Sequence, residues 1–398
     1  MKSAAFRMTS RRINAAWWGT VVLFLAHGLI VATWVSRIPA IKSSLRLNDA
    51  VFGLALLSSA VGAVCTIPFT GWLIGRFGAK NMSIAAGMAF CCSLVLPAAA
   101  FNAYSLAGAL FVFGAAAAAM DVSMNAHGVG VEKQLGSPTM SRFHAMFSLG
   151  GMAGAAIGGL VARNAIPPLP HFGVSAAVNL AAVLLVSKVL LDAGERTIKG
   201  EHRLPLNKIP RVLLALSAIG FCILLAEGAI ADWTALYLKQ ILKADAGTAA
   251  AGYAVFSAAM AIFRLLGDMI TSRLGPMRTV RSGSLVAAAG LLWALSVHAA
   301  YWALPGFAAT GAGLSVIIPL VFGSGGRVES IHPGAGIATV TGLGYLGFIV
   351  GPPVIGFASQ LFTLRYALGV VVACCLFTAL LSGSMRVLKP VQRELEVR

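Results

Sequence analysis

A short sequence pattern occurs twice in this chain, near residues 30 and 230, and each copy lies inside a long apolar segment. The copies read Ala26-His27-Gly28-Leu29-Ile30-Val31-Ala32-Thr33-Trp34 and Ala226-Glu227-Gly228-Ala229-Ile230-Ala231-Asp232-Trp233. Each copy is followed by a second apolar segment that ends in a Gly-rich basic turn, at residues 71–80 and 267–278. A spacing of about 200 residues is too long for a solenoid repeat. It fits a membrane protein built from two parallel halves around a central site.

The composition supports this interpretation, because the chain has too few charged residues to cover a soluble surface. Hydrophobic residues make up 58% of the sequence, charged residues 11%, and the mean hydropathy is +0.86. Soluble proteins carry about 25% charged residues. Five tryptophans lie near the ends of apolar segments, as in an interfacial aromatic belt: Trp17, Trp18, Trp34, Trp233 and Trp302. We therefore expect a multi-pass protein whose immediate partner is the lipid bilayer.

Apolar stretches long enough to span a membrane predict an all-α fold of twelve transmembrane helices in two pseudo-symmetric six-helix bundles. The predicted spans of the first half are Trp17–Ser36, Ala50–Gly75, Met82–Phe101, Tyr104–Ala126, Phe143–Arg163 and Phe172–Leu191. Those of the second half are Val212–Leu238, Ala249–Ser272, Val280–His298, Trp302–Gly323, Gly334–Leu361 and Tyr366–Met385. We assign residues 1–191 to the first half, 192–211 to a polar cytoplasmic linker, and 212–398 to the second half with its tail.

The basic residues follow the loops in a way that predicts membrane orientation. The formal net charge is +17. However, Lys and Arg are scattered over short loops instead of gathering on one face, which argues against nucleic-acid binding. They concentrate in alternate loops, as the positive-inside rule describes, with the segment 37–46 as the main exception. We therefore expect both termini to be cytoplasmic, in a bacterial inner membrane.

Two features point away from a metal site, a cofactor or an enzyme. The six cysteines all fall inside apolar segments, with neither C-x-x-C spacing nor a His cluster beside them, so we expect small buried hydrophobes. His144 and Ser148 are one helical turn apart, but no acid partner or oxyanion feature accompanies them, so they do not predict a nucleophilic enzyme. No loop besides the linker could hold a soluble domain, which leaves function to the membrane bundle.

With two six-helix halves joined by a cytoplasmic linker, the sequence resembles the major facilitator superfamily. The turn Gly71-Trp72-Leu73-Ile74-Gly75-Arg76-Phe77-Gly78-Ala79-Lys80 is similar to that family's G-x-L-x-D-R-x-G-R-K loop, with Gly75 in place of the Asp and Ala79 in place of the second Arg. The segment Arg264-Leu265-Leu266-Gly267-Asp268 resembles the R-x-x-G-D version. The resemblance implies gating roles for Arg76, Lys80, Arg264 and Asp268. Arg264 and Asp268, four residues apart on one predicted helix, are expected to form an ion pair.

Within this superfamily the chain resembles fucose-permease-like sugar transporters and the rhizopine-permease group. Three segments carry the likeness: Asp121-Val122-Ser123-Met124-Asn125, the run from Arg142 to Gly150, and Glu227-Gly228-Ala229-Ile230-Ala231-Asp232-Trp233. The likeness implies a proton-carrying role for Asp121, and we assign a gating role to Arg142. Since one fold hosts many solutes, it gives little information on substrate identity.

Ionisable groups inside apolar segments are the candidate functional residues, because each is costly in a bilayer. His27 and Glu227 occupy equivalent places in the repeat, and with Asp121 they are the candidates for proton coupling. For His27 the alternative is a plain hydrogen bond to a neighbouring carbonyl. Asp121 and Asn125 are four residues apart and share a helix face, where they suit a hydroxyl-bearing solute. Asp232 is expected nearer the periplasmic end, with a role at the cavity mouth or between helices.

The remaining candidates are aromatic rings and small-residue stripes with more than one use. Trp34 and Trp233 could stack on a sugar ring, although anchoring at the membrane interface is the ordinary use. Glycines at four-residue spacing, at 150, 154 and 158 and again at 347 and 351, predict close helix packing and could also let helices rock. The adjacent prolines 352 and 353 are expected to kink their span.

These observations lead to a transporter hypothesis with one main alternative. The first hypothesis is a monomeric secondary transporter that moves a small polar solute, sugar- or cyclitol-like, by alternating access with proton coupling. The second is a proton-driven exporter of amphipathic drugs or metabolites. A membrane-embedded enzyme or receptor is the least supported class.

Overall fold

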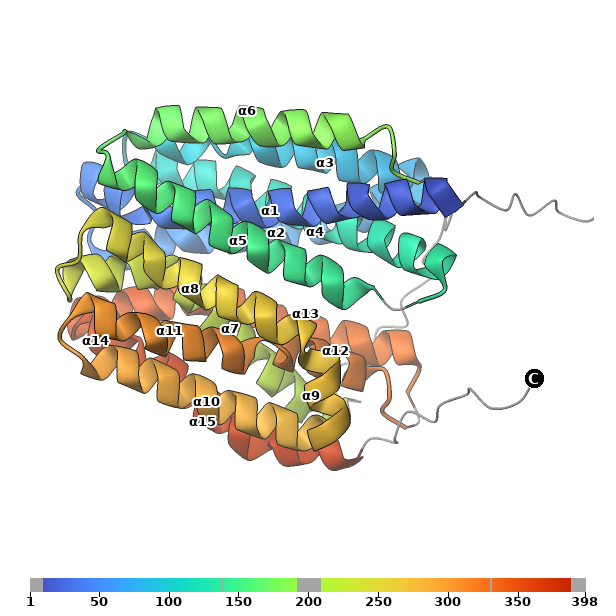
Figure 1. The fold of residues 1–398 in the computed structure, drawn as a ribbon. Helices are drawn as coiled ribbons and strands as arrows, with labels where there is room; N and C mark the ends of the chain where they lie inside the picture. The colour runs from blue at the N-terminus through green and yellow to red at the C-terminus, as the bar shows by residue number, and fades with distance from the viewer. Residues whose placement is uncertain (1–9, 138, 192–208, 330, 388–398) are drawn as a thin grey trace, which may run out of the picture.

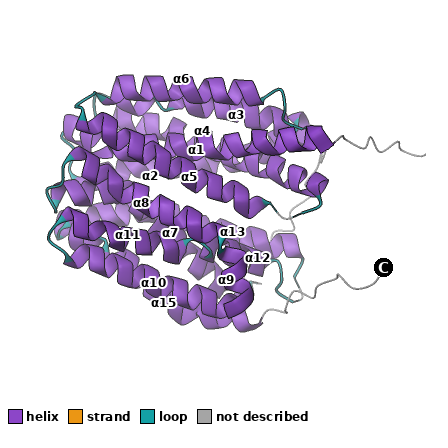
Figure 2. Ribbon diagram, viewed as in Figure 1, coloured by secondary structure: helices purple, strands orange, loops and turns teal. Residues whose placement is uncertain are grey.

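The structure, a computed structural model, describes residues 10–137, 139–191, 209–329 and 331–387. Within these ranges the secondary structure is entirely helical, and long helices run side by side along one common direction (Figure 2). Eleven apolar stretches of the described residues are long enough to cross a membrane. The predicted linker at residues 192–211 falls almost wholly outside the described residues, so the predicted domain boundaries stay a prediction.

In the described residues, the first half contains six long helices and one short 3-10 turn. They are α1 (Ser10–Ser44), α2 (Asp49–Phe77), α3 (Ala79–Ser93), η1 (Leu96–Ala99), α4 (Ala103–Leu135), α5 (Met140–Arg163) and α6 (Pro168–Val186). Polar caps define several helix ends. Asn48 accepts a hydrogen bond from the backbone of Val51 at the start of α2, and Asn102 forms a capping box with Ser105 at the start of α4.

The second half repeats this plan with more interruptions. Its elements are α7 (Arg211–Gln240), α8 (Ala246–Leu265), α9 (Gly267–Leu274), α10 (Pro276–Ser296), α11 (Ala300–Leu314), α12 (Ile317–Gly325), α13 (Pro333–Leu361), α14 (Leu364–Ala367), α15 (Gly369–Leu381) and η3 (Ser382–Val387). The predicted all-α fold is confirmed: each of the twelve predicted spans corresponds to one helix or to consecutive short helices.

The helix ends differ from the predicted spans in two ways. α1 extends beyond both ends of the predicted span Trp17–Ser36, because its flanking turns remain helical outside the apolar stretch. The predicted span Ala249–Ser272 is divided at Leu266 into α8 and α9, and Trp302–Gly323 is divided after Leu314 into α11 and α12. The prolines at 352 and 353 lie inside α13, which nevertheless continues to Leu361.

The two halves lie one above the other in Figure 1, with α1–α6 above and α7–α15 below. Between them, α5 packs against α8 and α2 packs against α13, and α1 also contacts α7. The glycine stripes serve close packing, as expected. A Cβ added at Gly150 would collide with the carbonyl oxygen of Leu25 in α1, and one added at Gly347 would collide with that of Phe221 in α7. These contacts fix α5 on α1 and α13 on α7.

We call the end of the bundle where α1 ends and α2 begins the closed end; it lies at the left in Figure 1. Here Gly53 of α2 and Gly356 of α13 bring the two halves into backbone contact. Lys42 Nζ lies 2.6 Å from Asp49 Oδ1, and both side chains are mostly buried. The hydroxyl of Ser359 in α13 donates a hydrogen bond to Asp49 Oδ2. A carboxylate of the first half thus binds a cation of its own half and a hydroxyl of the other.

Candidate functional site

A cavity of about 860 Å³ lies between the two halves. It is lined by side chains of α1, α2, α4 and α5 on one side and of α7, α8, α9, α12 and α13 on the other, and most of them are apolar. The acidic, basic and histidine side chains of the lining are His27, Asp121, His144, Glu227, Asp232, Arg264 and Asp268. The cavity therefore collects the ionisable groups that the sequence singles out within its apolar segments.

The cavity opens toward one end of the bundle only. In one direction its lining reaches Met140 and Ser141 in the first turn of α5, and Thr271 in α9. In the other direction the lining stops at Leu56 of α2 and Pro352 of α13, next to the backbone contact between these helices. The mouth thus lies at the end where α1 begins, opposite the closed end.

On the first-half wall, Asp121 and Asn125 of α4 are joined by a hydrogen bond. The Nδ2 of Asn125 donates to Asp121 Oδ1 at 3.0 Å and to the Asp121 carbonyl oxygen at 2.8 Å. The predicted shared face is therefore correct. Since an ionised carboxylate has about four acceptor positions, one amide donor leaves capacity for a bound solute.

His27 of α1 lies near the same wall, between two aromatic rings. Its ring centroid is 5.0 Å from that of Phe90 and 5.4 Å from that of Phe147. Neither ring nitrogen has a hydrogen-bond partner among the described residues, so the alternative of a simple bond to a nearby carbonyl is not realised. A buried imidazole without a partner at a cavity wall is available to a proton or to a solute.

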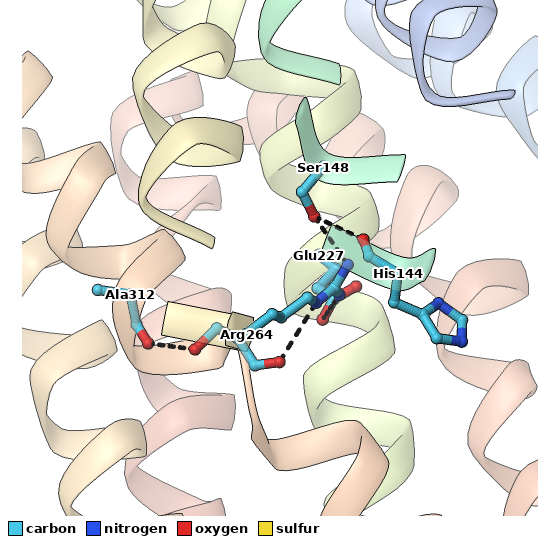
Figure 3. Close-up of polar contacts among 6 residues, drawn as sticks. His144, Ser148, Glu227, Arg264 and Ala312 are labelled. Atoms are coloured by element: carbon cyan, nitrogen blue, oxygen red, sulfur yellow. Dashed lines mark hydrogen bonds and ion pairs between the residues drawn. The ribbon is translucent and has the colours of Figure 1, made fainter. Parts of the chain in front are cut away.

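On the opposite wall, Arg264 of α8 contacts α5, α7 and the segment between α11 and α12 (Figure 3). Its Nη1 donates to Ser148 Oγ of α5 at 2.9 Å, and its Nε donates to the carbonyl oxygen of Ser315, between α11 and α12, at 3.3 Å. Its Nη2 lies 3.8 Å from Glu227 Oε1 of α7. Because α5 belongs to the first half and α8 to the second, Arg264 links the halves inside the cavity.

Two further lining residues, Tyr345 and His144, were not identified from the sequence as solute contacts. Tyr345 of α13 lies close enough to Asp121 and Glu227 to interact electrostatically with both. His144 of α5 interacts with His27 and with Arg264 in the same way. In the sequence His144 is notable only as a neighbour of Ser148, and Tyr345 lies in the glycine-rich segment before the prolines. No sequence pattern therefore distinguishes either residue as a solute contact.

The two tryptophans of the repeat have different environments. Trp34 lines the cavity and packs against Phe113, with ring centroids 6.2 Å apart. Trp233 does not line the cavity: it is fully buried, with its ring edge-on to Phe52 of α2 at 5.7 Å. The expectation of a solute-stacking or interface role for Trp233 is therefore not met in this structure, because the ring is fully enclosed and has Phe52 at its edge. Asp232, the residue directly before Trp233 in α7, does line the cavity.

The residues predicted to gate lie in three different places. Arg76 is exposed at the end of α2, with its guanidinium over the rings of Trp72 and Phe77. Lys80 at the start of α3 and the exposed Arg142 lie outside the cavity lining. Asp268 lines the cavity, but Arg264 pairs with Glu227 and not with Asp268. The expected Arg264–Asp268 pair is wrong because the helix is interrupted at Leu266, between the two residues.

Comparison with known proteins gives concordant matches over most of the chain. A family model described as Major Facilitator Superfamily matches residues 16–328. An uncharacterized MFS-type transporter of Yersinia pestis is 35% identical over 90% of this chain and 93% of that protein. The membrane protein MosC of Rhizobium meliloti is 31% identical over 88% of this chain and 87% of that protein.

Solved structures share the fold at low sequence identity. FucP in the outward conformation aligns with a TM-score of 0.62 at 16% identity, over 93% of this chain and 99% of that one. An inward-facing, unoccupied bacterial homologue of the lysosomal transporter Spinster aligns with a TM-score of 0.72 at 14% identity, over 98% of this chain and 100% of that one. The nucleoside transporter NupG aligns with a TM-score of 0.71 at 14% identity, over 94% of this chain and 98% of that one.

Proposed function

Because the chain belongs to the major facilitator superfamily, whose members carry small solutes across membranes, we propose that it is a proton-coupled transporter of a small polar solute, sugar- or cyclitol-like. The proposed mechanism is alternating access, in which the central cavity faces one side of the membrane at a time. The residues proposed for coupling are Glu227, Asp121 and His27. Those proposed for solute contact are the same three with Asn125, Asp232 and Trp34.

The observation that carries the proposal is the contact of Arg264 with Glu227 in its own half and with Ser148 in the other. The pair is incomplete: Glu227 Oε1 accepts no hydrogen bond, and its separation of 3.8 Å from Arg264 is longer than a direct bond. A proton that neutralises Glu227 would remove its attraction for Arg264. The guanidinium would then be held by Ser148 and Ser315 alone.

This arrangement provides a physical route from proton binding to movement of the halves. Charge on Glu227 draws Arg264 toward α7, whereas loss of that charge favours the contact with α5 of the first half. Because the two positions of Arg264 differ in how strongly they hold the halves together, protonation changes the balance between inward- and outward-facing states. We propose that Arg264 is a gating group in this sense, with Asp268 at the mouth as an accessory.

The geometry supports a polar solute in the middle of the cavity. Asp121 with Asn125 on α4 and Glu227 with Asp232 on α7 provide acceptors on opposite walls, and Tyr345 provides a hydroxyl near both carboxylates. The predominantly apolar remainder of the lining favours the second candidate, an exporter of amphipathic compounds. The two candidates differ in the solute that binds, which a binding screen distinguishes.

The cavity mouth lies at the end of the bundle where α1 begins, so with cytoplasmic termini this state faces inward. We propose that orientation, in a bacterial inner membrane, with the monomer as the working unit. The two six-helix halves, joined by the linker at residues 192–211, are then the bodies that move.

The first experiment is solute-induced thermal stabilisation of the purified protein with sugars, cyclitols, amino sugars and amphipathic cations, at acid and neutral pH. A ligand that binds the folded state raises the unfolding midpoint by mass action. Stabilisation by polyols that strengthens at acid pH supports the symport proposal. Stabilisation by amphipathic cations alone contradicts it and supports the exporter.

The solute found in this way allows a transport test in proteoliposomes. We expect Arg264→Ala to change the ratio of inward- to outward-facing molecules without weakening solute binding, as measured by distances between labelled helix ends. Arg273→Ala, in exposed α9 and outside the cavity lining, is the matched control. Loss of solute affinity in Arg264→Ala at an unchanged conformational ratio would assign Arg264 to the solute site and not to gating.

A further inference from the structure

A second, smaller pocket lies at the closed end, far from the central cavity. Its volume is about 300 Å³, and it lies between the last turns of α1 and α7. Its polar lining consists of Lys42, Ser43, Arg46, Lys239 and Gln240. Three of these side chains are cationic, and the lining contains no carboxylate.

Of the three cationic side chains of this pocket, one is paired with a carboxylate and two are not. Lys42 is paired with Asp49 at 2.6 Å. Arg46 and Lys239 are exposed at the pocket, and neither has a hydrogen-bond or ion-pair partner among the described residues. Arg46 comes from the first half and Lys239 from the second. Closure of this end therefore brings two like charges from different halves to one concave site, which disfavours closure unless an anion lies between them.

We propose that this pocket is an oxyanion site, which binds a phosphate-type group between Arg46 and Lys239. Arg46 offers a planar set of donors that suits phosphate oxygens, Lys239 adds a compact charge, and Ser43 and Gln240 add neutral donors. These donors suit either a free phosphate or the phosphate headgroup of an anionic lipid. The partial negative charge at the C-terminal ends of α1 and α7 favours each cation separately, but it does not account for the convergence of both cations on one pocket.

The site has a consequence for conformation, and this part rests on the proposed alternating access. Since α1 and α7 belong to different halves, both walls of the pocket are together only while this end is closed. An anion that binds here stabilises the state in which the central cavity opens to the opposite end. It acts at a distance from the solute and without contact with any residue of the central cavity.

The test uses the full chain purified in detergent and requires no transport. Sodium phosphate is titrated against the thermal unfolding midpoint, with sodium chloride at equal ionic strength as reference. We expect a saturable rise for the wild type and an at least tenfold weaker half-saturation in Arg46→Gln and in Lys239→Gln. Lys243→Gln, an exposed neighbour outside the pocket lining, should respond like the wild type.

A second experiment, in lipid nanodiscs, distinguishes a free phosphate from the phosphate headgroup of a lipid. If the headgroup of an anionic lipid fills the pocket, nanodiscs of phosphatidylglycerol should stabilise the protein by themselves, and added phosphate should have no further effect. In nanodiscs of phosphatidylcholine, added phosphate should still stabilise the protein. The proposal is overturned if neither phosphate nor phosphatidylglycerol stabilises the protein saturably, or if the two pocket variants respond like the wild type. If phosphate binds but does not narrow the distribution of spin-label distances across the closed end, the proposed effect of the anion on conformation is overturned. The transport proposal is unaffected by that result.

Discussion

The hydrogen bond from Ser359 to Asp49 is a polar contact that crosses between the halves at the closed end, and its removal should open that end more often. In Ser359→Ala the Lys42–Asp49 pair stays intact, so each half keeps its own contacts. A hydrogen bond to a charged group contributes about 1.5–3 kcal/mol. At about 1.4 kcal/mol per factor of ten, the population open at this end should rise between roughly 10-fold and 150-fold.

The rate of cysteine modification measures this population even when it is small. Ala231, a cavity-lining residue of α7, is changed to Cys in a background where the six native cysteines are replaced. A membrane-impermeant maleimide is then added from the side of the closed end. If opening and closing are fast compared with labelling, the rate is proportional to the open fraction. We therefore expect it to rise by the same factor in Ser359→Ala.

The matched control is Ser296→Ala, because Ser296 is an exposed serine at the same end whose hydroxyl bonds to a carbonyl of its own helix, that of Trp293. Its labelling rate should stay within about a factor of two of the parent. The reasoning is refuted if Ser359→Ala changes the rate by less than about threefold, or if the control changes it equally, since the bond would then contribute less than a typical charged hydrogen bond.

Three further predictions concern coupling, solute binding and stability. Glu227→Gln should abolish proton-driven uptake and spare solute exchange in proteoliposomes, and unchanged proton dependence would remove Glu227 from coupling. Asp121→Asn should weaken solute binding at least tenfold in the thermal-shift titration, because an amide cannot replace the charge; full affinity would make its role structural. Asp245 caps α8: its carboxyl accepts hydrogen bonds from the Thr248 hydroxyl and from the backbone nitrogens of Thr248 and Gly247. These bonds, that of the hydroxyl foremost, lower the pKa of the carboxyl. Asp245→Ala should cost about 1 kcal/mol of stability at pH 7, and its deficit should shrink as the pH falls below the ordinary Asp pKa of about 4, because wild type loses the charged cap there; a pH-independent deficit would contradict this.

The fold could be predicted because its signals are local. Twenty-residue apolar runs and alternating basic loops indicate the spans and their order, and caps such as Asn48 mark where helices begin. The breaks at Leu266 and after Leu314 could not be predicted, since both segments remain apolar across them. Such breaks depend on how the segment packs against its neighbours.

The candidate site was predicted in part for the same reason. His27, Asp121, Glu227 and Asp232 are ionisable residues in apolar segments, and the structure places all of them at one cavity. The partner of Arg264 could not be predicted, because it depends on which helix lies opposite. Sequence proximity favoured Asp268, whereas the three-dimensional arrangement brings Glu227.

The backbone contact between Gly53 and Gly356 has a mechanical consequence. Gly356 has twenty-three residues of α13 on one side and five on the other, and Gly53 divides α2 similarly, with twenty-four and four. At a rise of about 1.5 Å per residue, the long arm of α13 measures roughly 35 Å and the short arm about 8 Å. The two helices therefore form a pair of unequal levers about this contact, so that a rotation which moves the closed end by 1 Å moves the mouth of the cavity by about 4 Å.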